Sequence, residues 1–243
     1  NISGTMYLLD VFISPSDWYL EEVKNIFNDN PKVVKLPPPS RVELFKDAKN
    51  ENFSKDHKRI LHIAGKTAIK DRNGTSTIFE MLKHSKSDYE LVIKSQTAIQ
   101  NIPEDSRITV EIGDVKNRQD MYKGFDAMIL PRRYAGLCLP MNEALLSGLP
   151  VFMTDISPNN AVLPSKWLAK SNKIDTLQTQ ALTDVYEADS RELAKIVDNY
   201  VNSNKQKEKQ EAFDIGFNNF SAEKLQPQYL DLLDNIQKDG LPK

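Results

Sequence analysis

Short apolar runs alternate with helix-forming stretches through the middle of the chain. The expected strands are Arg59 to Ala64, Leu91 to Lys94, Ile108 to Ile112, Asp126 to Leu130 and Val151 to Met153, and helices are expected at Thr75 to His84 and Arg118 to Gly124. Runs such as Leu91-Val92-Ile93 are typical of parallel strands that are buried on both faces. The pattern predicts an α/β fold with a doubly wound parallel sheet. Such sheets bind ligands outside the carboxyl ends of their strands.

Composition narrows the functional classes. The formal net charge of -2 over 243 residues gives no global argument for binding nucleic acid or an anionic membrane. Cys138 is the single cysteine, which excludes an internal disulfide and a cysteine zinc cluster, and the three histidines lack metal-ligand spacing. No apolar run is long enough to span a bilayer, and no signal peptide is visible. We therefore expect a cytoplasmic protein without a metal site.

The stretch from Leu130 to Pro150 has the features of a phosphate site. It leaves a strand, crosses a loop with two arginines and Gly136, and starts a helix at Pro140, the expected first helical position. Unpaired N–H groups and the macrodipole favour an anion at a helix start. Glu143 lies one helical turn after Pro140, close enough to face the same phosphate site. Each feature also has an ordinary interpretation, in which Pro140 only begins a helix and the arginines are solvated.

The flanking regions suggest where domains meet. Arg41 to Asp56 is polar and turn-prone, follows three prolines, and is the best candidate for a linker that holds a domain boundary. Lys205 to Glu211 carries mixed charges typical of a solvated helical face. The remaining expected elements are a strand at Tyr7 to Ser14, a helix at Trp18 to Phe27, a short strand at Val33 and Val34, and helices at Ser190 to Asn202 and Ala222 to Ile236.

Several stretches, in order, resemble the nucleotide-sugar half of retaining GT-B glycosyltransferases of the group 1 type. Ile63-Ala64-Gly65-Lys66 with Arg72-Asn73-Gly74-Thr75 is similar to the loop that begins the donor domain of that family. Glu111 to Val115 with Phe125-Asp126-Ala127, and Gly136 to Val151, are similar to two later family segments. The likeness covers roughly residues 8 to 236. The run from Pro131 to Leu145 also resembles bacteriophage sugar transferases, some of which decorate DNA bases.

The resemblance implies a role for each cation and glycine of the first loop. Lys66 and Arg72 would hold the donor diphosphate and stabilise the leaving nucleotide, so they are the expected catalytic residues. Gly65 and Gly74 would allow the backbone to approach the donor closely. No Asp-x-Asp pair occurs in the sequence, so we expect no metal and no cofactor, with UDP-glucose as the most suitable co-substrate.

The resemblance assigns the rest of the donor site to the second loop. Gly136 and the amides of Leu137, Cys138 and Leu139 would bind the distal phosphate, and Glu143 would accept both ribose hydroxyls. The family has a second acid eight residues before Glu143, where this chain has Ala135. Either another group such as Arg133 or a backbone amide binds the sugar, or the sugar type differs, or catalysis is impaired.

The resemblance also implies a domain plan. Residues 1–45 would be the end of the acceptor domain and the hinge, 46–220 the donor domain, and 221–243 a helix that crosses back. Most of an acceptor domain is absent from this sequence, and an upstream segment is expected to complete it. The acceptor stays open, with DNA as one option. Two other interpretations remain: a nucleotide-sugar binding module without turnover, and a regulatory or scaffolding α/β domain.

Overall fold

A six-stranded, fully parallel sheet forms the centre of the molecule. The computed structural model describes residues 9–28, 32–66, 71–134, 136–178 and 182–238. The strand order is β5-β4-β3-β6-β7-β8, and every neighbouring pair is parallel. The bounds are β3 Arg59–Gly65, β4 Glu90–Ser95, β5 Ile108–Ile112, β6 Ala127–Leu130, β7 Val151–Thr154 and β8 Leu168–Ala169. This confirms the predicted doubly wound sheet, and the five strands expected from the sequence are all present.

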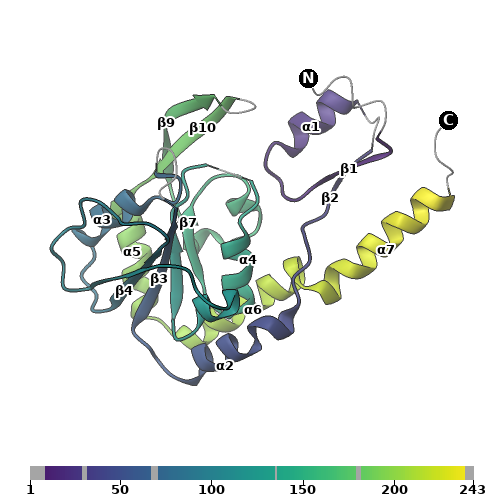
Figure 1. Ribbon diagram of the computed structural model, residues 1–243. Helices are drawn as coiled ribbons and strands as arrows, with labels where there is room; N and C mark the ends of the chain where they lie inside the picture. Colours follow the sequence, from purple (N-terminus) through teal and green to yellow (C-terminus); the bar gives the residue numbers. More distant parts are fainter. Residues whose placement is uncertain (1–8, 29–31, 67–70, 135, 179–181, 239–243) are drawn as a thin grey trace.

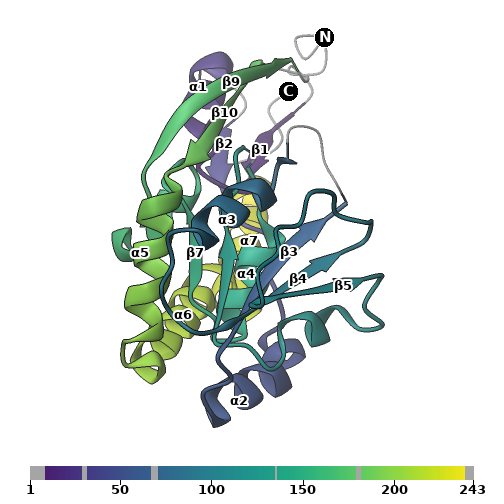
Figure 2. The same ribbon diagram turned by 90° about the vertical axis from the view of Figure 1, so that its left-hand side faces the viewer.

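Helices cover both faces of this sheet, as Figures 1 and 2 show. On one face α3 (Thr75–Leu82) contacts α5 (Ser190–Val201), and on the other α4 (Leu139–Leu146) contacts α6 (Lys205–Phe220). The strands between them are apolar and closed to solvent; Leu61, Ile129 and Phe152 have no exposed surface. The stretch expected as a short helix after β5 is a 3-10 turn, η5 (Arg118–Tyr122).

The segment expected to be a linker is helical, which corrects that prediction. Residues 42–45 form the 3-10 helix η3 (Val42–Phe45), and α2 (Lys46–Ser54) follows directly. The segment reads as polar because only Phe45, Ala48 and Asn52 are buried. The Asn52 side chain donates to the carbonyls of Tyr122 and Ser147 at 2.9 Å each, which attaches the helix firmly to the sheet domain.

The charged stretch at the start of α6 also differs from the prediction. Gln206, Lys207 and Gln210 are exposed, but Lys209 has no exposed surface and forms an ion pair of 2.7 Å with Asp126. Alternating charges predict a solvated face, whereas the fold places Lys209 against the Asn52 carbonyl and the Asp126 carboxylate.

A two-stranded antiparallel hairpin, β9 (Ser171–Gln178) with β10 (Leu182–Ala188), projects beyond the sheet. The sequence pattern did not predict this hairpin. No residue of β9 is buried, and its two apolar residues, Ile174 and Leu177, are separated by polar ones, so the segment lacks the apolar run that indicates a buried strand.

The chain begins with a small parallel unit, β1 (Val11–Ser14) and β2 (Lys32–Lys35), with α1 (Leu20–Phe27) between them. Residues 7 and 8 of the expected first strand lie outside the described residues. The last helix, α7 (Ala222–Lys238), extends away from the sheet beneath this unit (Figure 1). The Tyr229 hydroxyl donates to the carbonyls of Leu36 and Pro37 at 3.2 and 3.1 Å. The N-terminal unit and the last helix therefore contact each other.

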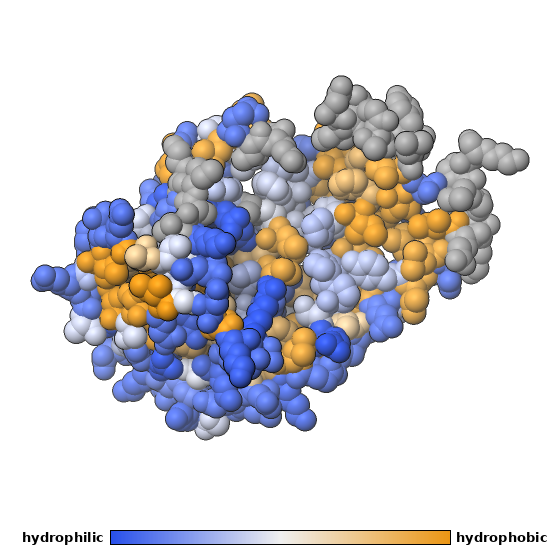
Figure 3. Space-filling view, in the orientation of Figure 1, coloured by the Kyte–Doolittle hydropathy of each residue, from blue (hydrophilic) through white to orange (hydrophobic). Residues whose placement is uncertain are grey.

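Apolar side chains remain exposed on the N-terminal unit and α7. Ile13, Ile26, Leu230 and Leu233 are 41–65% exposed. Figure 3 shows apolar residues gathered over these two elements, whereas the surface of the sheet domain is mostly polar.

Candidate functional site

The strand order creates a crevice at the carboxyl ends of β3 and β6. These neighbours lie at the centre of the sheet, and the chain builds outward from β3 to β4 and β5 on one side and from β6 to β7 and β8 on the other. Loops that leave such a pair diverge to opposite sides, and the gap between them is where this topology binds ligands. The two loops singled out from the sequence, after Gly65 and after Leu130, both begin here.

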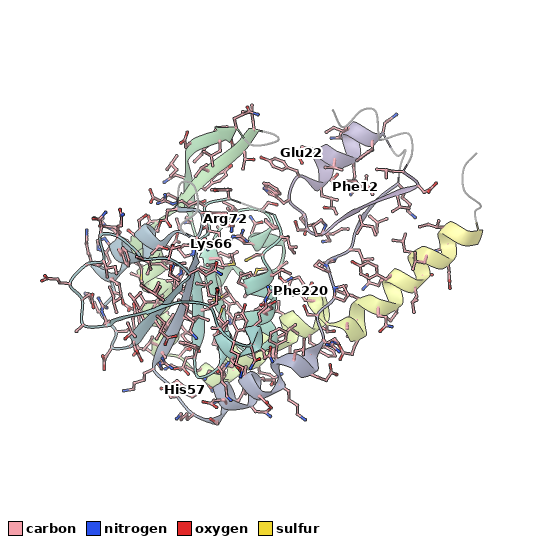
Figure 4. The ribbon with its side chains drawn as sticks, viewed as in Figure 1. Phe12, Glu22, His57, Lys66, Arg72 and Phe220 are labelled. Carbon is pink, nitrogen blue, oxygen red and sulfur yellow. The ribbon has the colours of Figure 1, made fainter. Side chains whose placement is uncertain are left out.

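The loop after β3 is held by its own polar side chains. The Asn73 amide donates to the carbonyls of Ile63 and Ala64 at 3.1 and 3.0 Å. The Asp71 carboxylate accepts from the N–H groups of Thr75 and Ser76 at 3.0 and 2.8 Å and caps α3. Residues 67–70 lie outside the described residues. Lys66 and Arg72 are both exposed, and Figure 4 shows them at the carboxyl end of the sheet.

Gly74 brings the two loops into contact. Its φ of 74° suits glycine, and a Cβ at this position would clash with the carbonyl of Pro131. The Arg133 N–H donates to the Arg72 carbonyl at 2.9 Å and joins the same loops a second time. Gly74 therefore has a clear packing role, while the direct donor contact expected of it stays a prediction.

His62 lies beneath the crevice and connects three elements. Its ring has no exposed surface; Nδ1 lies 3.0 Å from the Ile129 carbonyl and Nε2 lies 2.9 Å from the Thr75 hydroxyl. Because a carbonyl can only accept, Nδ1 carries the proton and Nε2 accepts from Thr75. Burial lowers the pKa of His62 to about 4, so the ring is neutral near pH 7.

This pKa predicts a loss of stability in mild acid. The unfolded histidine binds a proton near pH 6.5 and the folded one near pH 4, so the unfolded state binds more protons between these values. We expect the free energy of unfolding to fall by up to about 3 kcal/mol from pH 6.5 to pH 4. Urea unfolding at several pH values measures this, and the His62→Gln variant should lose most of the slope in that window. An equal slope in both proteins would contradict the assignment.

Arg133 lies in the loop after β6 and already has structural partners on other elements. Its Nη2 atom forms an ion pair of 2.6 Å with Glu187 of β10 and donates to the Ser76 hydroxyl at 3.0 Å. This guanidinium connects the crevice loop to the hairpin and to α3. A contact of Arg133 with the donor sugar would have to share or replace these bonds. Ala135 lies outside the described residues.

The start of α4 lies where the phosphate site was expected. The helix begins at Leu139 with Cys138 as N-cap, so Pro140 is the second helical residue, one position later than predicted. Pro140 has no N–H, and the N–H groups of Met141 and Asn142 donate to the Cys138 carbonyl at 3.0 and 3.2 Å, so few donors of this first turn are left for an anion. Gly136 packs against the Trp18 ring, where a Cβ would clash, so glycine is required here for packing. Cys138 is buried, and Leu137 is 38% exposed.

Glu143 is buried and already has a cationic partner. Its carboxylate, 8% exposed, accepts from Arg118 Nε at 2.8 Å and from the Tyr122 hydroxyl at 2.6 Å. Burial, together with the neighbouring Glu143 carboxylate, raises the pKa of Tyr122, so its hydroxyl stays a donor. Neither partner of Glu143 could be predicted from the sequence. Arg118 and Tyr122 fall in an ordinary short helical pattern, and no local signal points to Glu143, 25 and 21 residues away.

A pocket of about 500 Å³ opens beside this ion pair at the ends of β3, β4 and β5. Its volume suits a small ligand of nucleoside size. It is lined in part by Ile63, Lys94, Glu111, Arg118, Tyr122 and Pro140. Gly65 lines the same pocket, so the structure brings the end of β3, the start of α4 and the partners of Glu143 to one place.

Neither a metal cluster nor a membrane-spanning helix occurs in the described part of the chain. Among the described residues, no three histidine, cysteine or acidic side chains are grouped closely enough to hold a metal ion. Over the same ranges, no helix is long and apolar enough to cross a bilayer.

Solved structures with the same architecture place this fold among known proteins. HepE from Anabaena in complex with UDP and glucose superposes with a TM-score of 0.72 at 11% identity, over 97% of this chain and 66% of that one. Sucrose-phosphate synthase from Thermosynechococcus elongatus superposes with a TM-score of 0.70 at 14% identity, over 98% of this chain and 61% of that one. The chain has the GT-B glycosyltransferase fold.

The GT-B likeness covers only part of each solved structure, and it is a likeness of structure and not of sequence. The pneumococcal O-GlcNAc transferase GtfA in complex with UDP and GlcNAc, with a TM-score of 0.66 at 15% identity, matches over 95% of this chain but only 47% of its own length. The chain thus spans about half to two thirds of the length of these three glycosyltransferases. No protein-family model matches the sequence, and no curated protein matches it. The likeness therefore establishes the GT-B fold, and the activity is argued from the site.

Proposed function

We propose that this chain is the donor-binding part of a retaining glycosyltransferase that moves a sugar from a nucleotide diphosphate to an acceptor hydroxyl. The observation that carries the proposal is the crevice between β3 and β6. It combines exposed Lys66 and Arg72, the start of α4 and a nucleoside-sized pocket next to buried Glu143. Neighbouring folds that hold UDP support the nucleotide, and UDP-glucose is the donor we propose.

In this proposal the nucleoside lies in the pocket over β3, β4 and β5. Glu143 accepts the ribose hydroxyls, next to its partners Arg118 and Tyr122, which line the pocket. The diphosphate then lies across the switch point, where Lys66 and Arg72 neutralise it. These two cations supply the positive charge, and we propose that donor binding is independent of metal.

We also propose how the chain divides between a donor side and an acceptor side. Residues 1–45 and 221–243 would belong to the acceptor side, and 46–220 to the donor side. The bond from Ser40 N–H to the Phe220 carbonyl, at 2.8 Å, holds the two connections side by side and supports this division. An upstream segment would cover the apolar surface of the N-terminal unit. A hydroxyl on a modified base of phage DNA is the one acceptor class that the sequence resemblance suggests, and a phage-encoded protein of this kind would act in the host cytoplasm.

A calorimetric titration with UDP, GDP, ADP and their glucose forms tests donor binding. We expect one nucleotide to bind without metal, with no gain when Mg²⁺ is added. Binding that requires Mg²⁺ would overturn metal independence, and failure of all ligands would overturn the donor site. A chain that binds a nucleotide-sugar but never hydrolyses it would be the alternative, a binding module without turnover, which Ala135 favours.

Glu143→Gln should weaken nucleotide binding about tenfold or more. The substitution keeps the shape but removes the charge that strengthens hydrogen bonds to the ribose, and such bonds are worth about 1.5–3 kcal/mol. Calorimetry with the preferred nucleotide measures the change. Glu223→Gln, at an exposed position in the first turn of α7, is the matched control and should bind as the unaltered chain does. Unchanged affinity in Glu143→Gln would remove this residue from the donor site.

A further inference from the structure

Arg132 is a buried cation without a carboxylate partner. It follows β6 by two residues at the switch point, and only 7% of the residue is exposed. Its Nη1 atom donates to the Leu137 carbonyl at 3.2 Å, and its Nε atom has no hydrogen-bond partner. Among the described residues, no Asp or Glu oxygen lies within 4.0 Å of this guanidinium. Arginine carries five N–H donors, so most of its donor capacity is unused here.

Other arginines of the chain show how unusual this is. Arg133 is paired with Glu187, Arg107 with Asp105 and Arg118 with Glu143, all at 2.6–2.8 Å. A buried charge that lacks a counter-charge and most of its hydrogen-bond partners is unfavourable, and buried charges in proteins are normally paired. A cation left in this condition indicates that its partner is an anion supplied from outside the chain.

A second unsatisfied donor lies on the neighbouring helix. Asn142, in α4, is 1% exposed, and its Nδ2 atom has no hydrogen-bond partner. It lines a cavity of about 180 Å³ that Gly136, Leu137 and Cys138 also line. Arg132 and Asn142 therefore each have a buried nitrogen donor without an acceptor, one before and one after the start of α4 in the sequence. A ligand rich in acceptor oxygens and negatively charged, such as a phosphate group, satisfies this set.

We propose that Arg132 binds the sugar-bearing distal phosphate of the donor, an inference that rests on the proposed function. The nucleoside pocket lies over β3, β4 and β5, whereas Arg132 lies beyond β6 and contacts the loop that leads into α4. A diphosphate that extends from the pocket reaches this side with its second phosphate. Of the adjacent arginines, Arg133 attaches the loop to the hairpin, and Arg132 recognises the donor.

Titrations with UMP, UDP and inorganic pyrophosphate test the inference on the full chain and on Arg132→Gln. We expect the variant to bind UDP and pyrophosphate about tenfold or more weakly. UMP, which lacks the distal phosphate, should bind both proteins within about twofold. Arg132→Lys should recover part of the UDP affinity because it keeps the charge. Arg191→Gln, on the exposed start of α5, is the control and should leave all three affinities unchanged.

Three outcomes of these titrations would overturn the proposed role of Arg132. Equal UDP affinity in Arg132→Gln and the unaltered chain overturns this inference while the proposed function stands. An equal loss for UMP and UDP assigns Arg132 to loop structure and also overturns it. If the unaltered chain binds none of UDP, GDP and ADP, the proposed function fails, and this inference fails with it.

Thermal melting separates recognition from a structural role. Without ligand, Arg132→Gln should melt at the temperature of the unaltered chain or above, because an uncompensated buried charge is removed. With saturating UDP, the increase in melting temperature should be smaller than in the unaltered chain. A fall of more than about 5 °C without ligand would show that Arg132 stabilises the loop instead.

Discussion

Lys209→Met should destabilise the fold by about 3–5 kcal/mol, the usual effect of removing one partner of a buried ion pair. Lys209 has no exposed surface, and its Nζ atom contacts Asp126 at 2.7 Å and the Asn52 carbonyl at 2.5 Å. Asp126, 1% exposed, would keep one weaker cationic contact, with Lys205 at 3.3 Å. Methionine fills the space of the aliphatic part but leaves the carboxylate and the carbonyl short of donors. Urea unfolding measures the loss.

Two variants make this prediction specific. Lys207→Met, at an exposed position two residues earlier in α6, should change stability by no more than about 0.5 kcal/mol. The double variant Lys209→Met with Asp126→Asn should lose less than the sum of the two single losses, because the two residues act on each other. A loss below about 1 kcal/mol for Lys209→Met would show that water or another group satisfies Asp126.

This network lies at the opposite edge of the sheet from the candidate site. Asp126 immediately precedes β6, and its carboxylate also accepts from the N–H groups of His57 and Lys58, just before β3. Residues at the amino ends of parallel strands contribute to stability, whereas ligands bind at the carboxyl ends. We therefore expect Lys209→Met to leave nucleotide affinity unchanged under conditions in which the protein stays folded.

The sequence predicted the strands well because the strands of this sheet are buried on both faces. Leu91-Val92-Ile93 has no exposed surface, and a continuous apolar run is the signal of such a position. The exposed hairpin β9-β10 and helix α2 gave no comparable signal. Their buried positions are few and are separated by polar residues. The order of the strands, which creates the crevice, depends on long-range pairing that no local pattern contains.

The candidate site, too, could be predicted from the sequence only in part. The two loops could be predicted because each follows a buried strand. Which of the two adjacent arginines has an acidic partner could not be predicted, because Glu187 is 54 residues away in the sequence. Arg133 was chosen from the sequence, but the structure pairs it with Glu187 and leaves Arg132 without a carboxylate among the described residues. Similarly, the partners of Glu143 lie on a separate segment, and only the fold brings them together.

Arg72→Met should lower donor turnover about 10²–10³-fold, the usual loss when a group that stabilises developing charge is removed. In the proposed reaction, the bond between the sugar and the distal phosphate breaks with its electron pair on the nucleotide, and the sugar carbon bonds to the acceptor oxygen, or to water in the absence of acceptor, which loses its proton. Arg72 lies exposed at the crevice, and the bond from Arg133 N–H to its carbonyl, 2.9 Å, fixes its backbone. The side chain can therefore be replaced without moving the loop. Release of nucleotide from UDP-glucose measures turnover, and Arg191→Met is the surface control.

The same assay on Lys66→Met and on the double variant tests whether the two cations act together. If both neutralise one diphosphate, the double variant should lose less than the product of the two single losses, because residues that act as a unit are not additive. Losses that multiply fully would place the cations on separate groups. A loss confined to nucleotide affinity, with the same rate at saturating donor, would show that they bind ground state and transition state equally. The two cations would then be binding residues, and the source of rate acceleration would lie on the acceptor side.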